Sequence, residues 1–191
     1  MIAEPYATPI STLEATEPAQ PTFYVVSKRK FLLLYLATQG WYLLYWMYKN
    51  WKLYRTATGI KVMPMVRTFL SVFFVYSLFT RIDRRIVNSG QRYFWYPRSV
   101  ALVFIIACCL GAGQNWVWGL HLKIALGILS LLLQTACLLY VQDAINYGEC
   151  DAAGAGNSKL TFANGMWVSL GLCIWALAAL GIYMLSAGIA Y

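Results

Sequence analysis

The chain has 191 residues, of which 60% are hydrophobic and only 12% are charged, and its formal net charge is +8. Soluble domains carry about 25% charged residues, so this chain cannot cover a water-facing surface, and its composition excludes an ordinary soluble protein. A positive charge is also typical of nucleic-acid binding, but these basic residues alternate with Trp, Tyr and Leu beside apolar runs. We therefore expect a lipid bilayer with anionic headgroups as a partner, and no nucleic acid.

The charge is divided unevenly along the chain. Thirteen of the fifteen Lys and Arg residues lie between Lys28 and Arg98, where the only acid is Asp83. The chain after Arg98 is almost uncharged and strongly apolar. A basic half followed by an apolar half is typical of a membrane protein whose basic half lies against anionic lipid.

Residues 1–27 contain three Glu and four Pro but no Lys or Arg. This stretch lacks the basic start and apolar core of a signal peptide, and its composition predicts a disordered cytoplasmic tail. Residues 28–191 are predicted to form a single membrane domain.

Intervals without charge predict the helices. A spanning helix needs about 20 apolar residues, and the uncharged intervals 99–120, 124–142 and 160–191 meet that length, whereas 31–48 is marginal and 68–80 is too short. The fold class is therefore all-α, an integral membrane bundle of three spanning helices with an N-terminal basic aromatic helical hairpin. The predicted helices cover about residues 28–58, 64–89, 98–118, 121–146 and 160–188.

The first two predicted helices have recognisable ends. The first begins near Ser27 and runs to about Thr58, where Gly59 is a suitable C-terminal stop. The second begins at Pro64, a favourable first helical residue, and ends before Gly90.

Topology follows from the basic segments 28–30, 49–67 and 81–98, all of which favour the cytoplasmic side. If both first helices spanned the membrane, 49–67 would lie outside. We therefore favour a hairpin that enters from the cytoplasmic leaflet and returns, with the N-terminus in the cytoplasm. Two tilted spans with snorkelling Lys and Arg side chains remain the alternative.

Polar and small residues inside the apolar helices are expected to serve packing. Gln134 and Thr135 lie mid-helix and are expected to face other helices rather than a pore. Gly165, Ser169 and Cys173 recur at every fourth position, and such small residues let helix backbones approach closely, within one chain or in a homo-oligomer.

The fourth predicted helix ends in a polar stretch that contains Asp143 and Asn146, with Asn157 and Asn164 following in the chain. These side chains are expected to cap helix ends, and a small partner-binding site is the alternative.

The sequence contains no residue pattern that is typical of a catalytic or metal site. His121 is the only histidine and has no carboxylate in its loop, so it predicts neither a hydrolytic triad nor a zinc site. The five cysteines show no CxxC spacing and are expected to be reduced. We predict no catalytic residue, no metal and no cofactor, and we expect a protein that is not an enzyme.

The run from Tyr24 to Leu34, Gly40-Trp41-Tyr42 and the run from Tyr45 to Trp51 resemble a group of small uncharacterised bacterial multi-pass inner-membrane proteins, as does the stretch from Gln142 to Asn146. The resemblance covers most of residues 24–185 and implies a location in the inner membrane. It supplies no catalytic residue.

These features favour a non-enzymatic inner-membrane protein that binds a membrane-protein partner, with an immunity protein against a membrane-active toxin as one version. A small channel or transporter subunit is the alternative, and its lining would be Gln114, Asn115, Gln134 and Thr135. The candidate lipid- or partner-binding residues are Trp46, Lys49, Lys52, Arg84, Arg85, Asp143 and Asn146.

Overall fold

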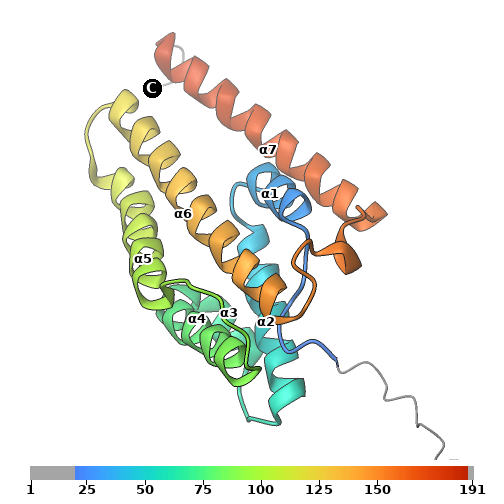
Figure 1. Ribbon diagram of the computed structural model, residues 1–191. Coiled ribbons are helices and arrows are strands. Elements are labelled where there is room, and N and C mark those ends of the chain that lie inside the picture. The colour runs from blue at the N-terminus through green and yellow to red at the C-terminus, as the bar shows by residue number, and fades with distance from the viewer. Residues whose placement is uncertain (1–19, 189–191) are drawn as a thin grey trace, which may run out of the picture.

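The computed structural model describes residues 20–188, which form helices and no strands (Figure 1). The helices are α1 (Lys28–Ala37), α2 (Tyr42–Thr58), α3 (Pro64–Phe69), α4 (Ser71–Asn88), α5 (Pro97–Gly113), α6 (Leu120–Gly148) and α7 (Phe162–Ser186), with short 3₁₀ turns η1 (Gln114–Trp116) and η2 (Ala155–Asn157). The predicted all-α class is confirmed.

Three helices are long and apolar enough to cross a membrane: α5 continued through η1, α6 and α7. α5 and α6 pack closely along their length, and Ser130 Oγ of α6 donates a hydrogen bond to the carbonyl of Ala107 (2.7 Å). α4 covers both helices, with Phe79 against Phe104 and Ile86 against Gly148. These three helices form the base on which the rest of the chain is placed.

The predicted single helix 28–58 is wrong, because the chain turns sharply between α1 and α2. Gly40 adopts a φ of 88°, which a glycine tolerates and an L side chain rarely adopts. Thr38 satisfies both helix ends, since its hydroxyl donates to the Leu34 carbonyl (2.7 Å) and accepts from the Tyr42 amide (3.0 Å). α2 does end at Gly59 in the left-handed conformation, as expected.

α1 and α2 form a hairpin that runs along α6 and returns. The Tyr35 hydroxyl of α1 donates to Gln134 Oε1 (2.9 Å), whereas Trp46 Nε1 of α2 donates to Gln142 Oε1, further along α6 (2.7 Å). Gln134 lies twelve residues before Asn146, which corresponds to about 18 Å of helix. The tip of this α1–α2 hairpin therefore reaches a depth of more than half a bilayer's hydrocarbon core.

The predicted second helix, 64–89, is also broken. It begins at Pro64 and its last part ends at Asn88, but Leu70 leaves helical geometry and separates α3 from α4. α4 buries one face against the bundle, at the i, i+3 and i+4 spacing of an amphipathic helix. The buried residues are Val75, Leu78, Phe79, Ile82 and Ile86. The returning hairpin thus lies within the predicted first helix rather than between the first and second.

Residues 22–27 were predicted to belong to a disordered tail, and this is wrong for that part. Phe23 and Val26 are core residues, and polar side chains bind the extended backbone between them. Glu149 accepts from the amides of Thr22 (3.1 Å) and Phe23 (3.2 Å). Asn146 accepts from the Val26 amide (3.4 Å) and donates to its carbonyl (3.0 Å). Residues 1–19 of the predicted tail lie outside the described residues.

α7 lies on the far side of α1 from α6 (Figure 1) and, among the described helices, packs on α1 alone. Gly171 is its only buried residue. A Cβ there would clash with the backbone carbonyl of Ala37, so glycine is required for the approach. The predicted stripe does not pack within this chain, because Gly165, Ser169 and Cys173 are exposed, and its use in a homo-oligomer stays a prediction.

The basic residues gather where α6 ends and α1, α5 and α7 begin, and we call this the Asn146 end. Lys28 pairs with Asp143 (2.9 Å), and Arg85 approaches Glu149 (3.8 Å). The opposite end carries the exposed Trp116 and Trp118. The two ends of the bundle therefore differ strongly in charge.

Candidate functional site: a lateral cleft between the hairpin and α7

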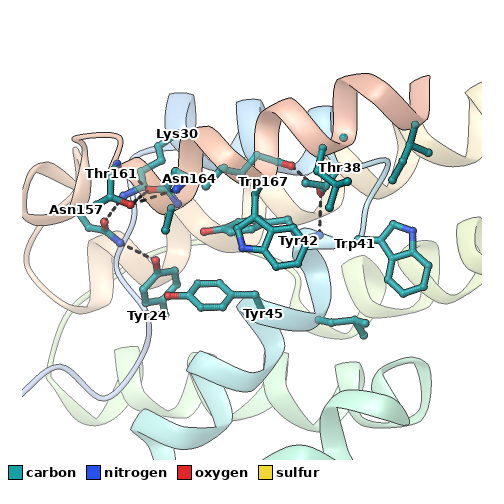
Figure 2. A pocket seen from close by; sticks show the side chains of 16 residues that line it. Tyr24, Lys30, Thr38, Trp41, Tyr42, Tyr45, Asn157, Thr161, Asn164 and Trp167 are labelled. Atoms are coloured by element: carbon teal, nitrogen blue, oxygen red, sulfur yellow. Dashed lines mark hydrogen bonds between the residues drawn. The ribbon is translucent and has the colours of Figure 1, made fainter. Parts of the chain in front are cut away.

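A cleft of about 660 Å³ opens between the α1–α2 hairpin and α7, beside their contact at Gly171 (Figure 2). Sites for small molecules typically measure about 300–1,000 Å³, so the space suits a ligand. Polar side chains gather at the Asn146 end of the cleft, whereas Trp41, at the hairpin tip, lies toward the other end. Its main lining residues are Tyr24, Lys30, Trp41, Tyr42, Tyr45, Asn157, Asn164, Trp167, Leu170 and Ile174.

Lys30 is the charged residue of the cleft. Its side chain starts from the first turn of α1 and is only 6% exposed. The ammonium donates to Asn157 Oδ1 (2.7 Å) and to the Lys159 carbonyl (2.8 Å). An ammonium has three N–H groups, and no other described residue accepts from the third. Burial lowers the pKa of Lys30 below its ordinary value, because desolvation disfavours the charged form. No carboxylate among residues 20–188 pairs with it.

Two tyrosine hydroxyls belong to the lining. The Tyr24 hydroxyl accepts from Asn157 Nδ2 (2.9 Å), which leaves its own proton for an acceptor. The Tyr42 hydroxyl is buried without a hydrogen-bond partner among the described residues. The Tyr42 hydroxyl is enclosed beside that of Tyr24, so Tyr24 is the tyrosine that can donate to an acceptor in the cleft.

The walls of the cleft are apolar and aromatic. Asn164, Trp167, Gly171 and Ile174 follow one another at spacings of three, four and three residues, which places them on one face of α7 toward the hairpin. Trp41, Trp167 and Ile174 remain exposed although they line the cleft. The cleft is therefore open at its side.

The start of α7 is fixed beside Lys30. Thr161 Oγ1 accepts from the Asn164 amide (3.3 Å), and Asn164 Oδ1 accepts from the Thr161 amide (3.0 Å). This capping box ends the loop that carries Asn157. Asn146 and Asn157 were expected to cap helices, but they bind the backbone of residues 25–27 instead.

Two of the predicted binding residues are not on the surface. Trp46 is fully buried against Phe31 and Gln142. Asn146 is fully buried against Val26 and Gln142. Their assignment to a lipid- or partner-binding surface is corrected, because both support the hairpin and the extended segment from inside.

The other predicted binding residues lie outside the cleft. Lys52 and Arg84 are exposed, and Lys49 is half-buried with its ammonium 5.6 Å from the Tyr45 ring centre. Arg85 and Asp143 take part in the ion pairs with Glu149 and Lys28. The structure therefore gathers these charges at the Asn146 end without forming one site.

Gln134 lies between helices. It accepts from Tyr35 and donates to Ser130 Oγ (2.8 Å). Thr135 donates to the Leu131 carbonyl of its own helix (2.6 Å), and Asn115 Nδ2 donates to the Ala112 carbonyl (3.3 Å). Three of the four residues of the suggested channel lining thus make hydrogen bonds within the chain, and the channel alternative stays a prediction.

In the sequence, Lys30 is the last of three consecutive basic residues and is not distinguished from the other two as a site residue. A signal was present, since Lys30, Leu34 and Ala37 share one helical face at the i, i+4 and i+7 positions. Asn157 was noticed, but the contact between residues 30 and 157 depends on the tertiary fold.

Comparison of the chain with protein-family models, with curated proteins and with solved structures finds no match. The resemblance to small bacterial inner-membrane proteins therefore stays a prediction. Among residues 20–188, no three His, Cys, Asp or Glu side chains lie where they could hold a metal ion together.

Proposed function

We propose that this chain is a non-enzymatic protein of the bacterial inner membrane and that it binds a membrane partner in the lateral cleft. The observation that carries the proposal is an open hollow between the α1–α2 hairpin and a helix of spanning length. Its exposed walls are apolar, and the charged Lys30 lies with Asn157 and Asn164 at one end. Such a hollow matches a molecule that is itself partly apolar and partly polar.

The weak attachment of α7 supports the same proposal. Apart from Gly171, the helix exposes or half-exposes every residue between Phe162 and Ser186. Its contact with α1 extends over only part of its length, since α1 has ten residues and α7 has twenty-five. A molecule in the cleft would add contacts on both sides and fix the distance between the hairpin and α7.

The crosslinking test compares two faces of α7. A photoactivatable phenylalanine analogue replaces Trp167 or Ile174 in the cleft, and the matched control replaces Leu172 or Leu180, which are exposed but do not line it. After illumination of whole cells, the cleft positions are expected to yield one defined adduct that the control positions do not. The same adducts from both faces would contradict a specific partner.

The chemical nature of the adduct tests whether the chain is an immunity protein against a membrane-active toxin. A crosslinked membrane-active toxin would identify an immunity protein, and protection of sensitive cells should then be lost in Leu170→Trp, which fills the cleft. A lipid adduct in place of a toxin would contradict the immunity-protein version.

We also propose that the Asn146 end faces the cytoplasm, because basic residues gather there and cytoplasmic segments are rich in Lys and Arg. The exposed native Cys150 lies at that end, where it accepts from Gln91 Nε2 (3.1 Å). A membrane-impermeant maleimide should leave Cys150 unlabelled in intact spheroplasts and should label Trp118→Cys. Labelling of Cys150 before lysis would reverse the orientation.

A further inference from the structure

We propose that the membrane partner of the cleft is an anionic phospholipid, with its phosphate at Lys30 and an acyl chain along α7 toward Trp41. The inference rests on the proposed function, because it names the partner of the same cleft. Three independent features support it: an uncompensated charge, a set of convergent donors and a depth that matches one leaflet.

The carboxylates of the described residues all have partners other than Lys30. Four acids lie among residues 20–188. Asp83 accepts from Trp95 Nε1 (3.0 Å), and Asp143 pairs with Lys28. Glu149 binds the amides of residues 22 and 23, and Asp151 binds the amides of residues 155 and 156. Each of these acids therefore has its own partner, and none of them neutralises Lys30.

Lys30 is consequently a buried cation whose described partners are both neutral oxygens. A buried charge without an opposite charge is unfavourable. An anion that enters the cleft supplies the missing charge and accepts the third N–H of the ammonium, and charge-assisted hydrogen bonds of this kind are the strong ones.

The remaining donors suit a phosphate. The Tyr24 hydroxyl has a proton left after accepting from Asn157, and the enclosed Tyr42 hydroxyl lies beside it. Both side chains line the same cleft as Lys30 (Figure 2). A phosphate group offers several acceptor oxygens to the Lys30 ammonium and the Tyr24 hydroxyl, whereas a neutral apolar ligand offers none.

The depth of the cleft matches one leaflet. Its α7 wall extends from Ala163 to Ile174, and a rise of eleven residues of helix corresponds to about 16 Å. Half of a hydrocarbon core about 30 Å thick has nearly the same depth. A headgroup beside Lys30 therefore places its acyl chain between Trp167 and the hairpin, where a complete transmembrane helix would extend beyond the cleft.

The test compares two lipids with identical acyl chains, phosphatidylglycerol and phosphatidylcholine, by native mass spectrometry of the full chain purified in mild detergent. The wild type is expected to retain phosphatidylglycerol about tenfold more strongly, because the choline of phosphatidylcholine balances the charge of its own phosphate, whereas phosphatidylglycerol brings a net negative charge to Lys30. Lys30→Gln should abolish the preference and Lys30→Arg should keep it.

The matched control is Lys28→Gln. It removes the same charge at a position two residues before Lys30, from a side chain that does not line the cleft. It should keep the preference. Equal retention of the two lipids by the wild type, or loss of the preference in Lys28→Gln as well, would overturn the inference.

A second pair of measurements separates a lipid from a free phosphate and does not depend on the folding of Lys30→Gln. Leu170→Trp should lower retention of both lipids, because it fills the apolar part of the cleft. Glycerol 1-phosphate, which has no acyl chain, should not displace phosphatidylglycerol. Displacement at equal concentration would show that the site binds phosphate alone and would contradict the lipid.

The two proposals fail differently. A protein adduct from Trp167 without a preference for phosphatidylglycerol would remove the lipid and leave a membrane partner in the cleft. Identical adducts from both faces of α7, together with no lipid preference, would remove both proposals.

Discussion

The hairpin side and the α7 side of this molecule are held by different kinds of interaction. On the hairpin side, Trp46, Gln142 and Asn146 form a continuous buried network that ends on the backbone of Val26. On the other side, α7 makes its close approach at Gly171 and adds one hydrogen bond, from Trp175 Nε1 to the Leu36 carbonyl (2.9 Å).

This difference indicates which region has a fixed position. A buried polar network specifies one arrangement, because any displacement leaves several groups without partners. A helix that makes one close approach at a glycine and otherwise exposes or half-exposes its residues can adjust its position at small cost. The hairpin side should therefore be insensitive to what occupies the cleft, and the position of α7 should depend on it.

The largest effect is expected from Asn146→Leu. The substitution leaves the buried amide and carbonyl of Val26 without partners and should lower the free energy of unfolding by about 3 kcal/mol. Thermal unfolding in mild detergent measures it. The control Asn115→Leu removes only an exposed bond to Ala112 and should change stability little. Equal effects of the two variants would mean that the network does not hold the hairpin side.

Gly171→Ala should have the next largest effect, about 2 kcal/mol, because the added Cβ forces the α1 and α7 backbones apart. Hydrogen exchange at residues 34–38 should increase while exchange at residues 141–146 stays unchanged. Gly165→Ala is the matched control on the same helix. It has nothing within 4 Å of the added methyl and should stabilise the helix by up to about 1 kcal/mol.

Gly40→Ala tests whether the turn makes the hairpin. A positive φ disfavours alanine by about 1–2 kcal/mol, and Gly40 has a φ of 88°. The midpoint of thermal unfolding should fall by an amount that corresponds to about 1 kcal/mol. Gly113→Ala, at a glycine with ordinary helical geometry and open space, should not lower it. No decrease in Gly40→Ala would indicate that residues 28–58 can form one continuous helix.

Lys28→Gln should have the smallest effect. The ion pair with Asp143 is partly exposed, and such pairs contribute up to about 1 kcal/mol and weaken with salt. Unfolding in low and in high salt should show a small difference that disappears at high salt. A loss as large as that of Asn146→Leu would place this ion pair in the network of the hairpin side.

The sequence predicted the parts of the fold that depend on composition and spacing. Uncharged intervals gave the three helices of spanning length, and Gly59 and Pro64 marked helix ends correctly. It did not predict the turn at Gly40, since a single glycine in an aromatic helical pattern is compatible with a continuous helix. It also missed the contribution of Phe23 and Val26 to the core, because nearby prolines and acids dominated that region.

The cleft could not be predicted from spacing alone. Lys30, Tyr24 and Asn157 meet there from α1, the segment before it and the loop before α7. The small stripe through Gly165 suggested one packing face, and the close contact is made by Gly171, one turn and a half further along the helix. Both helix faces carry small and apolar residues, so periodicity could not distinguish them.

The sequence by itself determined the helical membrane class and the placement of charge, because burying backbone and charge in hydrocarbon leaves few solutions. Only the tertiary structure decided that the first helix turns back, that Trp46 and Asn146 are buried and that Lys30 faces a cleft. These outcomes depend on contacts between residues about 100 to 130 positions apart in the chain. Which distant polar groups pair is set by the packing of whole helices and not by any local pattern.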